Sequence, residues 1–330
     1  MRTLVTGASG FVGSAIVHRL LDAGHDVRVL LRANSLQDNI EGLNVDIAIG
    51  DLADMATLKQ AATGCSAIFH VAADYRLWVP HPQAMYAANV DGTRNIMRAA
   101  LEAGVERIVY TSSVATLGVH PDGTSADEKT PSSLENMIGH YKRSKFMAEA
   151  VVHELIEKEA LPAVIVNPST PVGPRDIKPT PTGKMILDAA RGRMPAYVDT
   201  GLNIVHVDDV AAGHLLALDK GVIGERYILG GENMSLKDIL SQVATIAGRK
   251  PPRIRLPHNV VLPMAWVAQG IARLSNAAQP IMTVDGVRMA KKRMFYSSAK
   301  AERELGYTHR AVHEALHDAV EWFRGHGYCS

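Results

Sequence analysis

The sequence has few cysteines, almost no net charge and no long apolar run, and each absence excludes a class of protein. Only Cys65 and Cys329 occur, far apart in the chain, so neither a disulfide framework nor a cysteine zinc cluster is available. The 35 Lys and Arg residues balance 34 Asp and Glu residues, which leaves no basic surplus for nucleic acid or an anionic membrane surface. No apolar run reaches the roughly 18 residues that span a bilayer. We therefore expect neither a nucleic-acid partner nor a membrane span.

The length and the first residues indicate how the chain is organised and where it works. At about 150 residues per domain, a chain of 330 residues predicts two domains. Residues 1–5 run directly into a strand-like segment, which leaves no room for a signal peptide. We expect a cytoplasmic protein.

The first half of the chain alternates short apolar runs with longer helical stretches. Short buried strands that alternate with helices form right-handed βαβ units around a parallel sheet. This pattern predicts an α/β fold with a doubly wound parallel sheet. The predicted strands are residues 3–6, 26–31, 45–49, 67–71, 107–111 and 163–167, and the predicted helices are 11–23, 84–103 and 141–160.

The regular alternation ends after Asn167. Five prolines within residues 168–183 exclude a continuous helix or a central strand there. A strand at 204–207 and a helix at 208–220 are expected to rejoin the first domain. We predict a dinucleotide-binding domain of residues 1–172 and 204–228, and a smaller mixed substrate-binding domain of residues 173–203 and 229–330.

A glycine-rich turn, GxxGxxG, links the first predicted strand to the first predicted helix. One glycine makes the tight turn, another lets the backbone approach a pyrophosphate, and the third packs the helix on the sheet. The pyrophosphate then lies against free N–H groups at the helix N-terminus. An ordinary glycine-rich turn is the alternative, but the flanking strand and helix favour a dinucleotide. The predicted contacts are Gly7, Ser9, Gly10, Phe11, Val12 and Gly13.

The end of the second predicted strand indicates which dinucleotide is bound. NAD sites place an acidic residue there for the ribose 2′-hydroxyl, whereas NADP sites place an arginine nearby. This chain has Arg32 and no acid, so NADP is the predicted cofactor and NAD the alternative. Further predicted contacts lie after the third strand, at Asp51 and Leu52, and after the fourth, at Val71, Ala72 and Ala73. Tyr141 and Lys145 are also predicted to contact the cofactor, with Lys145 holding the nicotinamide ribose.

A tyrosine, a lysine and a serine form the predicted catalytic set. Tyr141 and Lys145 lie one helical turn apart and share a face. A phenol has a pKa near 10, and a neighbouring ammonium lowers it toward the range of a useful proton donor and acceptor. Ser113 follows a strand at the sheet edge where such folds bind ligands. A second YxxxK, Tyr296 and Lys300, lies far from the nucleotide-binding unit and is interpreted as packing or surface.

The glycine loop and the ordered set of Ser113, Tyr141 and Lys145 resemble the extended short-chain dehydrogenase/reductases, the NAD-dependent epimerase/dehydratase family. The resemblance spans nearly the whole chain and implies a Rossmann sheet with a small C-terminal substrate domain. Residues 74–78, 167–174 and 206–210 are most similar to a branch of hopanoid-associated sugar epimerases and dihydroflavonol-4-reductase-like proteins. By that resemblance Pro168, Ser169, Thr170 and Pro171 contact the nicotinamide end of the cofactor.

The sequence departs from the family pattern at some positions, and these departures let us rank three functional hypotheses. The first is an NADP(H)-dependent oxidoreductase that transfers hydride at a secondary alcohol or ketone of a sugar-derived or lipid-linked small molecule. Sugar epimerases of the family usually have an acid where this chain has Arg32, so a redox-neutral NAD(P)-dependent sugar epimerase of hopanoid biosynthesis is the second. The third, a non-catalytic cofactor sensor, does not need the intact catalytic set. The family often dimerises, so a homodimer is a further expectation.

Two other patterns are given structural interpretations. His309, His313 and His317 recur every fourth residue on the last predicted helix, but their outer members lie about 12 Å apart, too far to share a metal. We therefore predict no metal site. The apolar stretch 258–271 is interpreted as a core helix of the small domain, with contact to a lipid substrate as the alternative.

Overall fold

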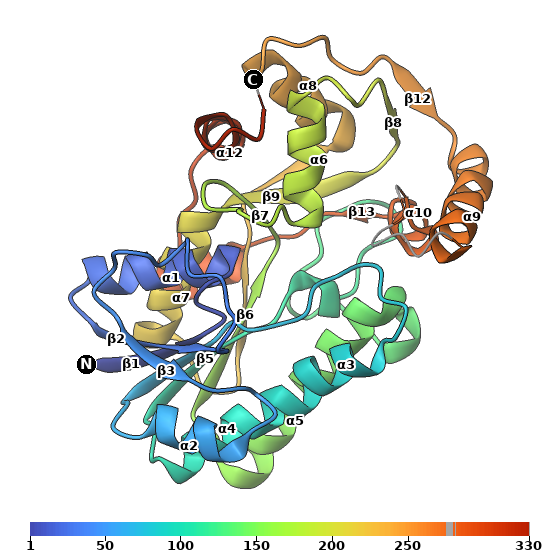
Figure 1. Ribbon diagram of the computed structural model, residues 1–330. Coiled ribbons are helices and arrows are strands. Elements are labelled where there is room, and N and C mark those ends of the chain that lie inside the picture. Colours follow the sequence, from blue (N-terminus) through green and yellow to red (C-terminus); the bar gives the residue numbers. More distant parts are fainter. Residues whose placement is uncertain (275–279, 281, 330) are drawn as a thin grey trace.

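A computed structural model describes residues 1–274, 280 and 282–329, and Figure 1 shows its arrangement. Its largest element is a seven-stranded parallel sheet in the order β10-β6-β5-β4-β1-β2-β3. This sheet confirms the predicted doubly wound α/β fold. Its strands are β1 (Arg2–Thr6), β2 (Asp26–Leu31), β3 (Asp46–Ile49), β4 (Ala67–His70), β5 (Arg107–Thr111), β6 (Ala163–Pro168) and β10 (Arg226–Leu229).

Helices cover both faces of this sheet, as alternating strands and helices require. On one face lie α1 (Phe11–Asp22), α7 (Val207–Lys220) and α11 (Ala299–Leu305); on the other lie α2 (Met55–Ala62), α4 (Gly92–Glu102) and α5 (Gly139–Glu159). Each strand contributes side chains to the hydrophobic cores on both faces of the sheet, because successive side chains point to opposite faces. In β1, Val5 joins the α1 and α7 side and Leu4 joins the α2, α4 and α5 side.

The helix predicted at 84–103 is divided into three pieces. A short α3 (Gln83–Tyr86) continues into a π-helical turn, η1 (Ala87–Asp91), before α4 begins. The wide turn contains Asn89, whose amide donates to Asp74 O at 2.9 Å and whose Oδ1 accepts from Asp74 N at 2.7 Å. Single π-turns inside α-helices often mark functional sites. Here the turn fixes the segment that follows β4 at the carboxyl edge of the sheet.

A second, smaller sheet lies beyond the carboxyl edge of the first (Figure 1). Its strands are β7 (Thr170–Val172), β9 (Gly201–His206), β11 (Glu232–Ser235) and β13 (Arg293–Met294), and β8 (Ala196–Val198) pairs with β12 (Ile254–Leu256) nearby. Three helices pack on the small sheet: α6 (Pro181–Ala190), α8 (Leu236–Ile246) and α12 (Val312–Gly325).

The strand predicted at 204–207 lies outside the large sheet. It belongs to β9, which pairs with β7 and β11. Only the helix that follows, α7, returns to pack on α1. The seventh strand of the large sheet is β10, which the sequence analysis did not identify. The boundaries proposed for the two domains stay a prediction.

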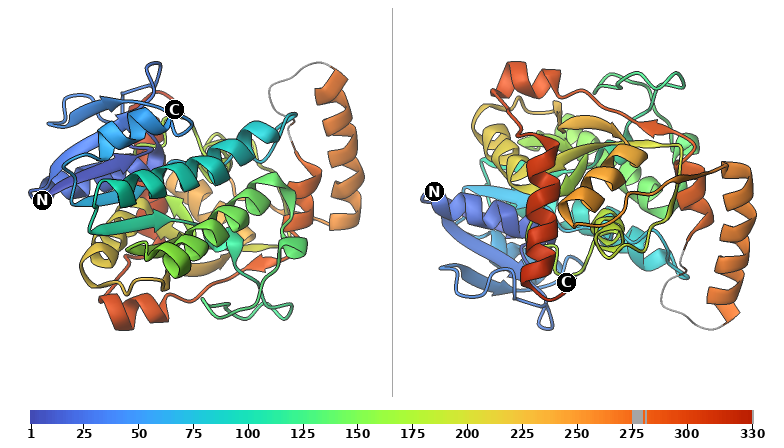
Figure 2. Two further views of the ribbon diagram at one scale, coloured as in Figure 1. Left: turned by 90° about the horizontal axis from the view of Figure 1, so that it is seen from below. Right: turned by 90° about the horizontal axis from the view of Figure 1, so that it is seen from above.

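The interpretation of residues 258–271 as a core helix is wrong for its outer face. The helix α9 (His258–Leu274) lies at the periphery beside α10 (Val284–Met289), as Figure 2 shows. Its Val261 and Ala265 are buried against α10, while Trp266 and Val267 are 55% and 63% exposed. Hydrophobic content alone does not distinguish a covered helix face from an open one. No helix in the part of the chain that the structure describes is long and apolar enough to cross a membrane.

The three spaced histidines do not share a helix, because α12 begins at Val312 and His309 precedes it. His313 and His317 stack with ring centroids 6.3 Å apart, and His317 contacts Asp318. Within the described residues, no group of three or more His, Cys, Asp or Glu side chains is arranged to hold a metal ion.

Because two histidines are buried, we expect the protein to lose stability in mild acid. His70 contacts Thr6 Oγ1 at 2.8 Å, and His214 contacts Thr111 Oγ1 at 2.9 Å. Burial lowers the pKa of His70 to about 3 and the pKa of His214 to about 4. The unfolded chain therefore takes up protons below about pH 6.5 while the folded chain does not, so the free energy of unfolding falls as the pH drops.

Urea unfolding measured between about pH 7 and pH 5 checks this expectation. The variant His214→Gln should show a smaller decrease than the native chain over that range. The exposed His81 gives the matched control, since His81→Gln should leave the decrease unchanged. An identical pH dependence in His214→Gln and the native chain would contradict the assignment.

Candidate active site

The glycine loop between β1 and α1 forms a cradle that only glycines allow. Gly7 has φ +72°, and a Cβ there would lie 2.7 Å from Ala72 N. A Cβ on Gly13 would lie 2.0 Å from Gly7 O. The first N–H groups of a helix have no intrahelical partner, so the start of α1, at Phe11 and Val12, presents donors toward this cradle. The loop fits the pyrophosphate of a dinucleotide.

Arg32 follows β2 at the same edge and is exposed. Its backbone N–H donates to Ser35 Oγ at 3.1 Å, while its guanidinium has no hydrogen bond or ion pair to another described residue. The positive charge of Arg32 acts on Asp74, where the Arg76 hydrogen bonds and Arg32 outweigh burial and hold the carboxyl pKa below its usual range. The Arg32 guanidinium is therefore free to bind an anion beside the cradle.

The remaining predicted cofactor contacts divide into two kinds. Val71, Ala72 and Ala73 follow β4 directly opposite the glycine loop, as expected, and Thr6 Oγ1 accepts from the N–H groups of Val71 and Ala72 at 3.2 Å. Asp51 instead holds its own turn, where its Oδ1 accepts from Ala53 N at 2.9 Å. The Leu52 side chain packs against the start of α4.

Ser113 and Tyr141 come together at the carboxyl edge of β5. Ser113 precedes the short helix η2 (Val114–Thr116), and its Oγ accepts from Ala115 N at 3.1 Å. The Ser113 side chain lies close enough to Tyr141 to affect the pKa of its hydroxyl. Burial raises the pKa of Tyr141, and the Ser113 side chain opposes that rise. Two hydroxyl-bearing side chains therefore lie near each other, an arrangement suited to binding a substrate oxygen.

Lys145 lies one turn along α5 but does not contact the Tyr141 hydroxyl in this structure. Its Nζ donates to Thr111 O at 2.9 Å and to Tyr110 Oη at 3.0 Å. Burial lowers the pKa of Lys145 to about 8, with Glu149 acting in the opposite direction. The expected decrease in the Tyr141 pKa caused by Lys145 is not seen, because burial and Ser113 govern that group.

A buried carboxylate holds the turn after β5 in place through hydrogen bonds. The sequence did not lead us to predict it. Glu149 accepts from the Ser112 hydroxyl, from Thr116 Oγ1 at 3.0 Å and from Asn167 Nδ2 at 3.1 Å. Arg226 neutralises it at 3.1 Å. The same Asn167 amide donates to Ser113 O at 3.0 Å. The signal was present in the sequence, because residues 141, 145 and 149 follow one another on a single helix face.

The predicted nicotinamide segment connects β6 to β7. Pro168 ends β6, and Thr170 and Pro171 begin β7. Between them, Ser169 N donates to Leu229 O at 3.1 Å, while the Ser169 hydroxyl is buried with no partner among the described residues. A buried polar atom of this kind is usually satisfied by a bound group. The segment fits the polar carboxamide of a nicotinamide.

The second YxxxK is confirmed as a packing feature. Tyr296 is buried, and its hydroxyl donates to Val114 O at 3.1 Å. Lys300 bonds Glu225 at 2.6 Å and lies over the Tyr227 ring. The two residues do not share a helix, since α11 begins at Ala299.

Comparisons with known proteins agree with this geometry. The model of the NAD dependent epimerase/dehydratase family matches residues 3–230. A protein of Synechocystis sp. named "Putative dihydroflavonol 4-reductase" is 49% identical, over 98% of this chain and 95% of that protein. Sterol demethylase protein B of Methylococcus capsulatus is 36% identical, over 99% of both chains. The crystal structure of gox2253 has a TM-score of 0.90 and 58% identity, over 99% of both chains.

Proposed function

The chain belongs to the NAD dependent epimerase/dehydratase family and is an NAD(P)-dependent oxidoreductase, and from this premise we propose that it reduces a carbonyl group with NADPH. The observation that carries the proposal is the proximity of Ser113 and Tyr141 at the carboxyl edge of the sheet that also holds the glycine cradle. The substrate class we propose is a ketone on a sugar-derived or lipid-linked molecule.

Each catalytic side chain has a distinct part in this reaction. NADPH supplies the hydride when bound. Ser113 and Tyr141 hold the carbonyl oxygen between their hydroxyls, and Tyr141 gives its proton to that oxygen as negative charge develops. Lys145, with a pKa of about 8, carries positive charge at neutral pH one helical turn from Tyr141. Its Nζ is bonded to Thr111 O and Tyr110 Oη here, so in the proposed reaction it favours a phenolate on Tyr141 through its charge and not through a direct contact.

Two observations favour a reductase over a redox-neutral epimerase. Arg32 stands free at the end of β2, where it can pair with a 2′-phosphate, and NADPH serves as an exchangeable reductant. Of two relatives, one is named a putative dihydroflavonol 4-reductase, which is a reductase name, and the other a sterol demethylase protein. The first of these names supports a reductase.

Stereospecifically deuterated NADPH, offered with candidate ketones, tests the proposal. Deuterium in the product together with stoichiometric NADP⁺ supports reduction. Product formed without net oxidation of cofactor, by protein isolated with bound NAD⁺, overturns it in favour of the epimerase.

Arg32→Asp is expected to erase or reverse a preference for NADPH over NADH. The native chain should bind NADPH at least several-fold more tightly, because a charge-assisted phosphate contact is worth about 1.5–3 kcal/mol. Fluorescence titration of both cofactors measures the ratio. The exposed Arg193 lies in the small unit, so Arg193→Asp makes the same change in charge and should keep the preference. Equal affinities in the native chain would refute the NADP assignment.

A further inference from the structure

A cavity of about 160 Å³ lies beside the catalytic hydroxyls, between α5 and the segment that joins α10 to β13. Its walls combine apolar side chains, among them Leu117, Met137, Met289 and Met294, with polar groups. Ala115, two residues after Ser113, also borders it. The cavity therefore begins where the catalytic turn ends, and a substrate held at Tyr141 can extend into it.

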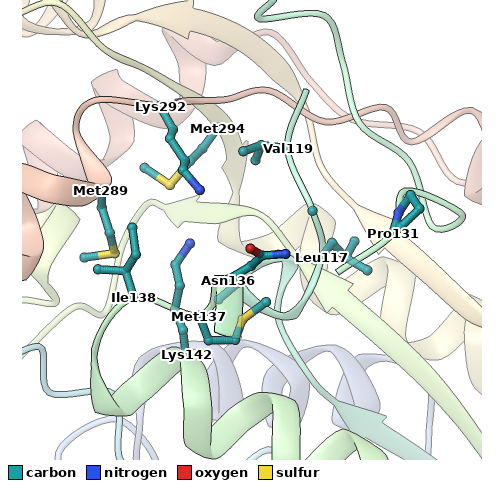
Figure 3. Close-up of a pocket in the computed structure, with 12 residues that line it drawn as sticks. Leu117, Val119, Pro131, Asn136, Met137, Ile138, Lys142, Met289, Lys292 and Met294 are labelled. Atoms are coloured by element: carbon teal, nitrogen blue, oxygen red, sulfur yellow. The ribbon is translucent and has the colours of Figure 1, made fainter. Parts of the chain in front are cut away.

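Two lysines line this cavity from opposite sides, and Lys142 is half-buried while Lys292 is exposed. Lys142 directly follows Tyr141 on α5, and Lys292 precedes β13. In Figure 3 the two amino groups point toward each other across the cavity. Among the described residues, neither side chain forms a hydrogen bond or an ion pair, and the described lining contains no carboxylate.

This arrangement is electrostatically unfavourable without an anion. Burial, and then the charge of Lys292, lowers the pKa of Lys142 to about 8, so the group is mostly protonated at neutral pH. A partly buried ammonium that faces a second one is costly unless an opposite charge joins them. An anionic group placed between the two amino groups removes the repulsion and replaces the lost hydration.

The methionines indicate what the anion is attached to. Met137, Met289 and Met294 supply flexible apolar side chains, which adapt to irregular apolar ligands. We propose that this cavity binds the anionic end of an amphiphilic substrate, with a carboxylate or phosphate between Lys142 and Lys292 and apolar carbon against the methionines. This inference rests on the proposed function, because it orients the substrate whose ketone lies at Tyr141.

Binding of simple amphiphiles tests the proposal without any turnover. Decanoate, decyl phosphate and neutral decan-1-ol share one apolar chain and differ in the head group. Calorimetry with NADP⁺ present should show that at least one of the two anions binds at least tenfold more tightly than decan-1-ol. The stronger of the two identifies the anion as a carboxylate or a phosphate.

Lysine variants show whether the cavity is responsible. The double variant Lys142→Met, Lys292→Met should lose the tenfold preference for the anion, and Lys142→Arg should keep it. The neighbouring Lys291 is exposed like Lys292 but lies outside the lining, so Lys291→Met is the matched control and should also keep it. Equal binding of decanoate, decyl phosphate and decan-1-ol, or a preference that survives the double substitution, overturns the proposal.

Failure of this inference is distinguishable from failure of the proposed function. If deuterium transfer from NADPH is seen but no anion preference is found, the cavity assignment alone is wrong. If the anion preference depends on both lysines but no ketone is reduced, the reductase assignment alone is wrong.

Discussion

Tyr141→Phe is expected to lower turnover by at least about 10²-fold, the usual scale of general acid–base catalysis. The variant keeps the half-buried ring on α5 but removes the hydroxyl near Ser113, which is the proton donor in the proposed reaction. Cofactor affinity should be unchanged, because the glycine cradle is separate from this group. Steady-state kinetics with NADPH and a reducible ketone, together with a fluorescence titration of NADPH, measure the two quantities.

Tyr296→Phe provides the comparison, because it removes the hydroxyl of the other YxxxK tyrosine. That hydroxyl donates to Val114 O at 3.1 Å, so its loss should cost about 1 kcal/mol of stability. Turnover should stay close to the native value. A large loss of turnover in Tyr296→Phe, with an active Tyr141→Phe, would show that the catalytic site is misplaced.

Most of the large sheet was predictable because its central strands are buried on both faces and consist mainly of apolar residues. The observed bounds of β2 (Asp26–Leu31) and β5 (Arg107–Thr111) equal the predicted ones. The glycine loop was predictable for a similar reason. Its glycines are required by the local backbone geometry, as the close approach of Gly13 to Gly7 O shows. Such geometry depends on neighbouring residues, so the sequence pattern predicts it.

What the sequence did not determine depends on contacts between distant segments. The apolar residues of β9 would show the same sequence pattern in either sheet. The partners of this strand, β7 and β11, lie about 30 residues away on either side. The exposure of Trp266 depends on which segments pack on α9, and the hydrophobic periodicity of the sequence carries no information about that. The partners of Lys145, a backbone carbonyl and Tyr110, are set by how α5 lies on β5.

Gly13→Ala is expected to weaken NADPH binding by about 10²-fold, the scale that a 1 Å misplacement produces at a positioned site. The new Cβ would lie 2.0 Å from Gly7 O, whereas ordinary contacts lie at 3.4–4 Å. The clash is with backbone, so no side chain can move aside, and the loop that cradles the pyrophosphate must open. Overpacking of this kind also costs about 1–3 kcal/mol of stability.

A second glycine inside a helix separates the clash from the general effect of adding a methyl group. Gly270 lies within α9, and a Cβ there meets nothing within 4 Å. Gly270→Ala should therefore gain about 0.5–1 kcal/mol, because alanine loses less backbone freedom in a helix. It should bind NADPH like the native chain. Urea unfolding and fluorescence titration of both variants measure the difference. Native NADPH affinity in Gly13→Ala would mean that the pyrophosphate does not lie on this loop, since no cofactor held there could tolerate the displaced backbone.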